Sequence, residues 1–479
     1  MQTKTIFLSG ICGSGMKPLA TIAAQQGYRV VGTDHNWDQQ SSSLTTLGVI
    51  GGTQPEPEKA ALADYYVYSS AIRPEHPERL AAEKAGIRIL HRMDLLNMLV
   101  RPSPVRFALA GTHGKTSSTS MAGWILLQAG LDPTIIAGGH PLYLEEGCRN
   151  GSANVAVYET DESDASFLKT EDGYRLILNV DRDHLNHYGS FDRLSEAFRY
   201  FAAASDTVIF AGDAHLVSIC KGLQPMAAFG PPEAELTELH NTDLFFTGRY
   251  YAGRFLDDDA LVVSLLLDGK PQYAQELEDA VIHLSLPGRH FAMNGLGVIA
   301  LIHAAIAKEP ALQRRFDPEN PKTLLELIEI LNAFPGVERR LERIGTVRGI
   351  PVYDDYGHHP TEIRAVIDAL QRRGARPLSV VFQPHRYTRT QELAAEFADV
   401  LAAAEHVYLL PLYSAGETPI EGVSSRSIAD RMQAEIIDPV RFDMVFEQNP
   451  AAVLFLGAGS VSSMGREYVA RRGSPKSVF

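Results

Sequence analysis

Four residues of one short segment carry the clearest chemistry in this chain. The segment "ALAGTHGKTSST" (residues 108–119) contains Gly111, Gly114, Lys115 and Thr116, so glycines stand beside a lysine and a hydroxyl group. An apolar strand precedes them and a helix follows. Amides at the helix start can bind a phosphate, Lys115 can add positive charge, and Thr116 can ligate Mg²⁺. The common phosphate loop has one further glycine upstream. An ordinary strand–helix turn is the alternative, and the context favours the phosphate site.

Acidic residues at strand ends strengthen this interpretation. Glu159 ends the apolar run "NVAVYE", and ligands of parallel sheets bind at the carboxyl edge. A carboxylate there can hold the Mg²⁺ that bridges nucleotide phosphates. Asp161, Glu162 and Asp164 follow, and their simplest role is to cap the next helix. His184 ends the run "NVDRDH"; it is either a ligand or a structural hydrogen-bonding residue.

A second glycine turn lies near the N-terminus. The stretch "GICGSG" contains Gly10, Gly13 and Gly15, and Asp34 ends the next strand. The spacing G-x-x-G-x-G departs from the dinucleotide fingerprint G-x-G-x-x-G, so NAD is not favoured. The strand–helix context still favours a phosphate-binding turn over a purely structural one.

Two polar segments in the last third follow apolar strands, and we expect them on one sheet edge. They are "DDYGHHPTE" and "FQPHRYTRT". Arginines three residues apart suit a carboxylate or a phosphate, because the guanidinium fork binds two oxygens at once. Solvated charged loops are the alternative. The residues that could converge are Asp354, Asp355, His358, His359, His385, Arg386 and Arg389.

Three α/β units are needed to position these groups. The runs "TIFLSG", "YRVVGTD" and "YYVYSSAI" alternate with helical patterns, which predicts a parallel sheet. Two prolines in residues 101–106 indicate a linker, and a second unit begins at "RFALAG". In that unit "ALVVSLLLDGKPQY" predicts a hairpin with its turn at Asp268-Gly269. A third unit begins near Pro335.

The totals exclude several classes of protein. The chain has 479 residues, a net charge of -14 and 45% hydrophobic residues, so we expect a globular protein without the basic face of a nucleic-acid binder. Three scattered cysteines indicate no disulfide framework. We read no apolar run of membrane-spanning length and no signal peptide. The expectation is a cytoplasmic α/β protein.

With these residues assembled, the chain resembles the Mur ligase family of ATP-dependent amide-forming ligases. The segment "AGTHGKT" resembles that family's shorter phosphate loop. The other matching segments lie between about residues 6 and 460 and are "ETDESDASFL", "PGRH", "DDYGHHPTE", "FQPHRYTRT" and "AGETPIEGVSSRS". The resemblance implies three domains: a Rossmann-like UDP-sugar domain at 1–103, a P-loop ATPase domain at 104–334 and a Rossmann-like domain at 335–479.

The matching member of the family joins L-alanine to the lactyl carboxylate of UDP-N-acetylmuramate through an acyl phosphate, in peptidoglycan precursor synthesis. The resemblance thus implies ATP and Mg²⁺ as cofactors and these two compounds as substrates. It implies no nucleic-acid or membrane partner, and a monomer or dimer. The alternative is the related recycling ligase, which joins a tripeptide to the same UDP-sugar and which "LSGICGSGM" and "GWILLQAG" resemble.

Site residues follow from the resemblance by position. The catalytic residues would be Lys115, Glu159 and His184. The metal ligands would be Thr116 and Glu159 for one magnesium and His184 for a second. The ATP-binding residues would be Gly111, Thr112, His113, Gly114, Lys115, Thr116, Ser117, Asn294, Arg340 and Asp355. The substrate-binding residues would be Gly13, Ser14, Gly15, Asp34, Ser70, His113, Tyr356, His358, Arg386 and Arg389.

One position departs from the family pattern. Members that add alanine usually read "GRHNALN", whereas this chain reads "GRHFAMN", with Phe291 in place of an asparagine. That puts one contact on the adenine side in doubt, while Asn294 remains. Two other classes of protein remain as alternatives. An NAD-dependent dehydrogenase would leave Lys115 and Glu159 without a role, and a non-catalytic nucleotide sensor would not need the cluster of polar residues in the last third of the chain.

Overall fold

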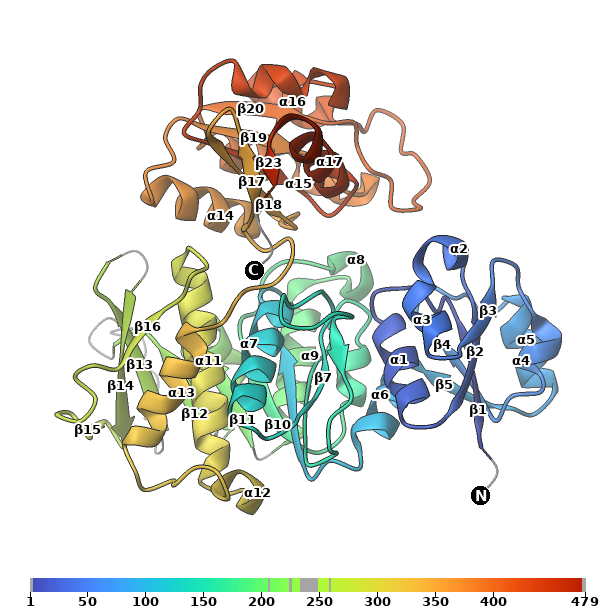
Figure 1. Ribbon diagram of the computed structural model, residues 1–479, viewed down its shortest axis with the longest axis vertical. Coiled ribbons are helices and arrows are strands. Elements are labelled where there is room, and N and C mark those ends of the chain that lie inside the picture. The colour runs from blue at the N-terminus through green and yellow to red at the C-terminus, as the bar shows by residue number, and fades with distance from the viewer. Residues whose placement is uncertain (1–2, 206, 224–225, 233–248, 258–259, 476–479) are drawn as a thin grey trace. The chain divides into compact units, whose positions relative to one another are not determined.

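The computed structural model describes residues 3–205, 207–223, 226–232, 249–257 and 260–475. It confirms the α/β class: three separate sheets carry helices along the chain (Figure 1). The chain divides into two compact units. The first comprises 1–254, 261–282 and 293–335, and the second comprises 255–260, 283–292 and 336–479.

The N-terminal sheet of the first unit is five-stranded, in the order β3-β2-β1-β4-β5, and all its described pairings are parallel. The strand order reverses at β1, because β2 and β3 lie on one side of β1 and β4 and β5 on the other. The glycine loop after β1 therefore lies at a switch point, where open α/β sheets bind ligands. The strands are β1 (Thr5–Ser9), β2 (Arg29–Thr33), β3 (Ile50–Gly52), β4 (Tyr65–Tyr68) and β5 (Arg88–His91). The helices are α1 (Lys17–Gln25), α2 (Trp37–Gln40), α3 (Ser42–Thr46), α4 (Pro57–Ala60), α5 (Pro77–Lys84) and α6 (Arg92–Val100).

Local sequence explains the ends of these helices. Pro18 stands in the first turn of α1, where its missing N–H costs nothing. Gly27 adopts φ +89° just beyond the end of α1, a conformation that favours glycine. At the start of α6, the side chains of His91 and Asp94 form a reciprocal capping box.

The central sheet is eleven-stranded, in the order β15-β14-β13-β12-β11-β10-β6-β9-β7-β8, with β16 paired to β14. Its strands are β6 (Val105–Ala110), β7 (Thr134–Ile136), β8 (Cys148–Arg149), β9 (Val155–Glu159), β10 (Tyr174–Ile177), β11 (Val208–Ala211), β12 (Ala227–Gly230), β13 (Arg249–Phe255), β14 (Ala260–Leu267), β15 (Lys270–Gln272) and β16 (Val281–His283). The helices are α7 (Lys115–Gln128), η1 (Ser166–Lys169), α8 (Leu185–Tyr188), α9 (Phe191–Ala203), α10 (Ala214–Ile219), α11 (Arg289–Ile306), α12 (Pro310–Gln313) and α13 (Lys322–Asn332).

The two sheets of the first unit share one apolar core. A single cluster of buried side chains joins residues of β1, α1 and α6, such as Leu8, Leu19 and Leu96, to Ala156 and Tyr158 of β9. Burial of apolar side chains is the main favourable term in folding. The N-terminal sheet is therefore stabilised in part by the central one.

Of two expectations for the central region, the structure confirms one and contradicts the other. The hairpin is confirmed: β14 and β15 pair antiparallel, and Asp268 and Gly269 of the turn adopt φ +49° and +72°. The expectation that no apolar run reaches membrane-spanning length is wrong, because α11 is long and apolar enough by length and composition. Within the protein 78% of that helix is buried, so it is packed as a core helix.

The second unit contains a seven-stranded sheet in the order β21-β20-β19-β22-β18-β17-β23. It is parallel except at β17, which pairs antiparallel with β18 and β23. The strands are β17 (Glu342–Val347), β18 (Ile350–Asp355), β19 (Leu378–Phe382), β20 (His406–Leu409), β21 (Glu435–Ile436), β22 (Ala452–Leu456) and β23 (Ser474–Pro475). The helices are α14 (Pro360–Arg372), α15 (Tyr387–Leu401), α16 (Arg426–Met432), η4 (Pro439–Phe446) and α17 (Val461–Arg472).

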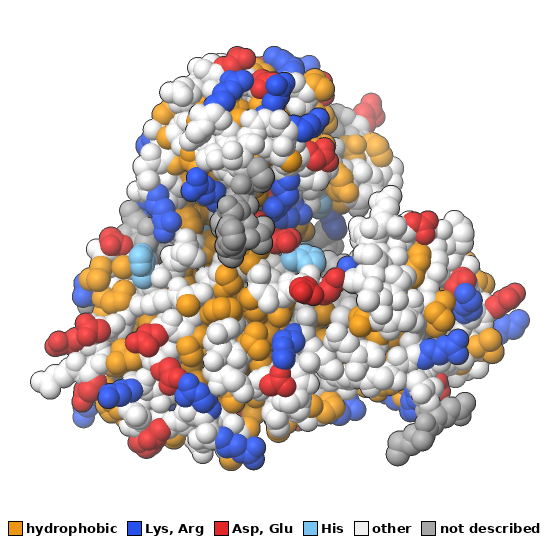
Figure 2. All heavy atoms as spheres, in the orientation of Figure 1, with side chains coloured by type: hydrophobic (Ala, Val, Ile, Leu, Met, Phe, Trp, Pro, Cys, Tyr) orange, Lys and Arg blue, Asp and Glu red, His pale blue; other side chains and the backbone are white. Residues whose placement is uncertain are grey.

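Charged side chains of both signs are interspersed on the face of the molecule that Figure 2 shows. On that face the described acidic and basic groups are intermixed, and the basic ones do not gather into one broad surface. This pattern agrees with the acidic total charge.

Candidate active site

The predicted phosphate loop connects β6 to α7. Gly111 adopts φ +142° and Gly114, the N-cap of α7, adopts φ +84°. A Cβ atom on Gly111 would lie 3.0 Å from Leu178 Cβ, and one on Gly114 would lie 2.5 Å from Asn294 Nδ2. Both glycines are thus required by conformation and by space. The loop places the amino end of a 14-residue helix at the carboxyl edge of the sheet, which is a site for an anion.

Lys115 crosses this loop. Its Nζ donates to the carbonyl oxygens of Gly111 at 2.7 Å and Thr112 at 3.2 Å, and it pairs with Glu162 at 2.8 Å. Burial alone lowers the pKa of a lysine, but the carboxylates of Glu162 and Asp161 outweigh burial and raise the pKa of Lys115. The lysine therefore stays charged beside the helix start.

Glu162 was not assigned to the site from the sequence. The expectation that it caps a helix is wrong in its case, since its fully buried side chain pairs with Lys115. Asp161 and Asp164 accept from the amides of Ser163 and Ser166 in local turns. Neither is the N-cap of η1, which is Ala165 and has no side-chain cap hydrogen bond. Neither spacing nor composition in the sequence distinguishes Glu162 from these two neighbours.

Thr116 and Glu159 lie side by side beyond the loop. The Thr116 hydroxyl donates to Glu159 Oε2 at 2.8 Å, so two oxygen ligands of the kind that Mg²⁺ prefers are adjacent. Gly138 makes room for this pair, since a Cβ atom there would lie 1.8 Å from Glu159 Oε1. The chemistry and spacing of the two side chains fit a magnesium ion on a nucleotide phosphate.

His184 and His113 lie on the same edge of the central sheet. His184 adopts φ +58°, and its Nε2 lies 3.7 Å from Glu162 Oε1 and 3.6 Å from Asp183 Oδ2. The His113 amide donates to Asn179 Oδ1 at 2.8 Å, and its ring Nε2 lies 3.0 Å from Asp181 Oδ2. His184 thus shares the partner of Lys115, while His113 faces the loop that follows β10.

The N-terminal glycine loop is fastened to the next strand. The amides of Gly10 and Ile11 donate to the Thr33 carbonyl at 2.8 and 3.1 Å, and the Cys12 amide donates to Asp34 Oδ2 at 3.0 Å. Gly13, Ser14 and Gly15 continue this loop toward α1. The structure thus brings Asp34, at the end of the next strand, to the glycine loop.

Ser70 lies where the N-terminal sheet meets the acidic loop after β9. Its hydroxyl lies 3.0 Å from His91 Nε2 and donates to Asp164. Arg92, which the sequence reasoning missed, donates to Asp161 at 2.8 Å and to Asp164 at 3.2 Å. Arg92 also borders the glycine loop, because a Cβ atom on Gly15 would lie 3.2 Å from its Nη1. The only sequence signal for Arg92 is its place directly after a strand.

The second unit carries its own cluster. Asp355 is 2% exposed and accepts from the amides of Leu341 at 2.7 Å and Gly357 at 2.6 Å. Burial raises the pKa of Asp355 to about 7, although the nearby charge of Arg340 opposes the shift. The Arg340 guanidinium lies 5.3 Å from the ring centre of Tyr356, a cation–π distance.

The predicted convergence of the two polar segments is confirmed within this unit. The ring of His358 lies 6.0 Å from that of His385, and His385 stacks on Tyr413 at 5.5 Å. Burial, helped by the charges of Arg389 and Arg386, lowers the pKa of His385 to about 4. Arg386 adopts φ +73° at the N-cap of α15, and Arg389 lies on the first turn of that helix.

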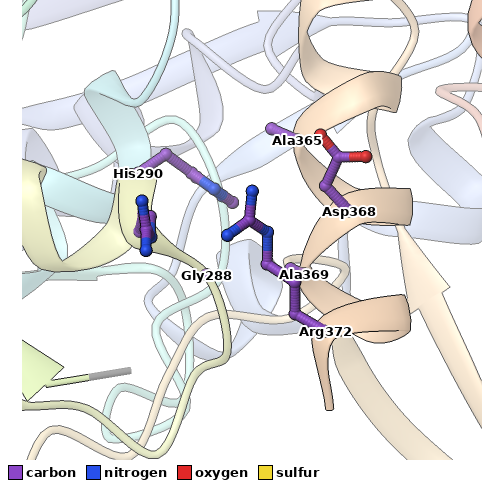
Figure 3. A pocket seen from close by; sticks show the side chains of 7 residues that line it. Gly288, His290, Ala365, Asp368, Ala369 and Arg372 are labelled. Carbon is purple, nitrogen blue, oxygen red and sulfur yellow. The ribbon is translucent and has the colours of Figure 1, made fainter. Parts of the chain in front are cut away.

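The "PGRH" segment borders a pocket of about 240 Å³ against α14. Figure 3 shows the side chains of His290 and Arg372 on facing sides of this pocket, with Asp368 farther along α14. Phe291, where the family pattern has asparagine, is 3% exposed, and its ring packs at a tilt against that of His290, with the ring centres 4.2 Å apart. Its ring is thus used in packing.

Comparison with known proteins shows which family this chain resembles. A family model described as "Mur ligase family, catalytic domain" matches residues 5–103, and one described as "Mur ligase, glutamate ligase domain" matches residues 339–458. A UDP-N-acetylmuramate–L-alanine ligase of Acidithiobacillus ferrooxidans is 36% identical, over 97% of each chain. One from Aquifex aeolicus is 34% identical, over 98% of each chain.

Solved structures give the same fold. A UDP-N-acetylmuramate-alanine ligase of Thermotoga maritima superposes with a TM-score of 0.74 at 25% identity, covering 98% of this chain and 99% of the other. A murein peptide ligase of Psychrobacter arcticus gives a TM-score of 0.65 at 20% identity, covering 99% and 100%. Because relatives 34–36% identical match nearly the whole of this chain, the chain belongs to the Mur ligase family.

Proposed function

We propose that this chain is an ATP-dependent ligase that joins L-alanine to the lactyl carboxylate of UDP-N-acetylmuramate, in the cytoplasmic synthesis of peptidoglycan precursors. The observation that carries the proposal is the near full-length identity of 34–36% to ligases with that activity in their names. The phosphate loop with Lys115 and the arginines of α15 supply the two kinds of group that this reaction needs.

The ATP phosphates bind at the start of α7 in this proposal. Amides of the loop from Gly111 to Ser117 point at the phosphate oxygens, and Lys115 exchanges its internal partners for them. Thr116 and Glu159 are the proposed ligands of one Mg²⁺ and His184 of a second; bound there, the ions supply positive charge to the phosphates. Asn294, Arg340 and Asp355 are proposed to contact the rest of the nucleotide.

The nucleotide-sugar is proposed to bind along the N-terminal sheet edge. The residues assigned to it are Gly13, Ser14, Gly15, Asp34, Ser70 and His113. Arg386 and Arg389 bind the carboxylate of the amino acid, which suits the guanidinium fork, and Tyr356 and His358 border the same position.

The chemistry proceeds in two steps. The lactyl carboxylate attacks the γ-phosphorus of ATP, and the bond between that phosphorus and the oxygen bridging it to the β-phosphate breaks. The products are ADP and an acyl phosphate. The alanine amine then attacks the acyl carbon, and inorganic phosphate leaves. Negative charge builds on phosphate oxygens in the first step and on the carbonyl oxygen in the second. Lys115 and the arginines act by positioning the reactants and by stabilising that charge.

We further propose domain boundaries at 103/104 and 334/335. The N-terminal sheet ends at His91 and the central sheet begins at Val105, which supports the first boundary. The sheet of the second unit begins at Glu342, which supports the second.

An assay of ADP release tests the function. We expect release that requires both UDP-N-acetylmuramate and L-alanine, with glycine and L-serine as competing amino acids. Release of ADP that needs no amino acid would contradict the proposal, and so would reduction of NAD without any release of ADP.

The recycling reaction is the second candidate. The likeness to a murein peptide ligase at 20% identity supports the shared fold, and the relatives that are 34–36% identical favour L-alanine. Adding the tripeptide L-alanyl-γ-D-glutamyl-meso-diaminopimelate in place of L-alanine separates the two. Faster ADP release with the tripeptide would favour the recycling ligase.

A further inference from the structure

A carboxylate is buried beneath the N-terminal glycine loop and belongs to none of the groups assigned above. Glu78 lies in the first turn of α5, and its side chain is fully buried. A buried carboxylate is costly unless hydrogen bonds satisfy it. Its partners therefore indicate why it is there.

Three donors from three separate segments converge on Glu78. Thr33 Oγ1 donates to its Oε1 at 2.6 Å, and the Glu56 amide donates to the same oxygen at 2.8 Å. The Ser9 hydroxyl donates to Oε2. A carboxylate only accepts, and its two oxygens offer about four lone-pair sites, so one side chain can hold all three segments.

Two of these donors directly precede the glycine loop, which carries Gly13 to Gly15, and Asp34. Ser9 is the last residue of β1, and the glycine loop begins at the next residue. Thr33 is the last residue of β2, and Asp34 follows it. The loop itself is attached to Thr33, whose carbonyl accepts from the amides of Gly10 and Ile11. The Glu78 carboxylate thus fixes the two strand ends that carry the loop and Asp34.

We propose that Glu78 is a positioning residue for the nucleotide-sugar. By binding the ends of β1 and β2, it holds the glycine loop and Asp34 in the positions that the ligand needs. This proposal rests on the proposed function of the N-terminal sheet. Its ligand is a nucleoside diphosphate sugar, since the diphosphate binds to loop amides whose direction depends on where the two strands end.

The test compares the binding of two ligands to variants of the full chain. E78A removes the acceptor of the buried Thr33 hydroxyl and of the Glu56 amide, and it leaves the Ser9 hydroxyl with the Tyr66 hydroxyl at 2.7 Å. We therefore expect the affinity for UDP-N-acetylmuramate to fall by about tenfold or more. E78Q keeps one acceptor oxygen, so we expect a fall of about threefold. The affinity for ATP should change by less than about twofold in both variants, because the phosphate loop of α7 lies outside this network.

A matched control is A82G on the same helix. Ala82 is buried in α5 and makes none of these hydrogen bonds, and glycine destabilises a helix by about 1 kcal/mol. We expect A82G to lower the melting temperature without changing affinity for the nucleotide-sugar. If A82G weakens that affinity as much as E78A does, the role of Glu78 is only structural and the proposal is wrong.

T33V provides a second test if E78A does not fold. Valine keeps the shape of threonine and removes one donor to Glu78, and we expect about a threefold loss of UDP-N-acetylmuramate affinity. Unchanged affinity in T33V and E78Q would overturn the proposal. A wild-type protein that binds no UDP-N-acetylmuramate would overturn the proposed function itself, so the two failures are distinguishable.

Discussion

The substitution Gly138→Ala tests whether the Thr116–Glu159 pair works where the structure places it. Gly138 has no positive φ, so alanine is compatible with its backbone. The added Cβ would lie 1.8 Å from Glu159 Oε1 and 2.7 Å from Glu159 Cδ. Because Cβ contacts under 3.0 Å are essentially absent from real proteins, the carboxylate must move by at least about 1.2 Å.

That displacement breaks the 2.8 Å contact with Thr116 and moves the proposed magnesium ligand. Misplacement of a catalytic group by about 1 Å can cost about 10²-fold in rate. We therefore expect kcat for ADP release to fall about 100-fold, with a higher concentration of Mg²⁺ needed for half-maximal activity. The free energy of unfolding should change little. Alanine lowers the entropy of the unfolded chain, which stabilises the folded state by about 0.4–1 kcal/mol and offsets part of the cost of moving the carboxylate.

The assay is ADP release with UDP-N-acetylmuramate and L-alanine, titrated with Mg²⁺. Gly52→Ala is the matched control, since Gly52 has no positive φ and a Cβ atom there meets nothing within 4 Å. We expect its Mg²⁺ dependence to equal that of the wild type. Turnover of Gly138→Ala within about threefold of wild type would refute the assignment of Glu159 as a metal ligand.

Four further predictions follow from the site and the core. Lys115→Ala should abolish ADP formation while the circular dichroism spectrum is retained, and near wild-type turnover would remove Lys115 from the site. Gly114→Ala should weaken ATP binding by about tenfold or more, because its Cβ meets Asn294; Gly130→Ala, which has a similar φ and open space, should not. Arg386→Ala should raise KM for L-alanine by about tenfold without raising KM for ATP, and equal increases would contradict its role. Burial lowers the pKa of His303 to about 4, so its neutral form stabilises the fold above pH 6.5 and this stability is lost as pH falls toward 4. As the pH falls from 6.5 to 5, the free energy of unfolding measured with urea should fall by about 2 kcal/mol more in the wild type than in His303→Gln. Parallel pH profiles of the two proteins would contradict this.

Features encoded by neighbouring residues could be predicted from the sequence. The hairpin around Asp268-Gly269, the helix after Lys115 and the strand ends at Glu159 and Asp34 all depend on local patterns. Spacing was also enough to place "DDYGHHPTE" and "FQPHRYTRT" on one edge of a sheet, because parallel strands share that edge.

Contacts between distant segments could not be predicted in this way. The pairing of Glu162 with Lys115 joins positions 47 apart, and that of Arg92 with Asp161 joins positions 69 apart. The role of Glu78 depends on which strand ends lie next to α5. The topology of the sheet decides this, and the periodicity of the sequence does not show it. Composition likewise could not show that the apolar helix α11 lies in a protein core.

The apolar cluster shared by the two sheets of the first unit bears on how this protein can be divided. A cut near residue 103 would divide this cluster, with Leu19 and Leu96 of α1 and α6 in one fragment and Tyr158 of β9 in the other. We expect apolar surface to become exposed on both fragments. Such exposed patches favour aggregation. We therefore expect the N-terminal fragment to express poorly alone and to recover when the two fragments are produced together. A graft of this region onto another ligase must carry the matching surface of β9 with it.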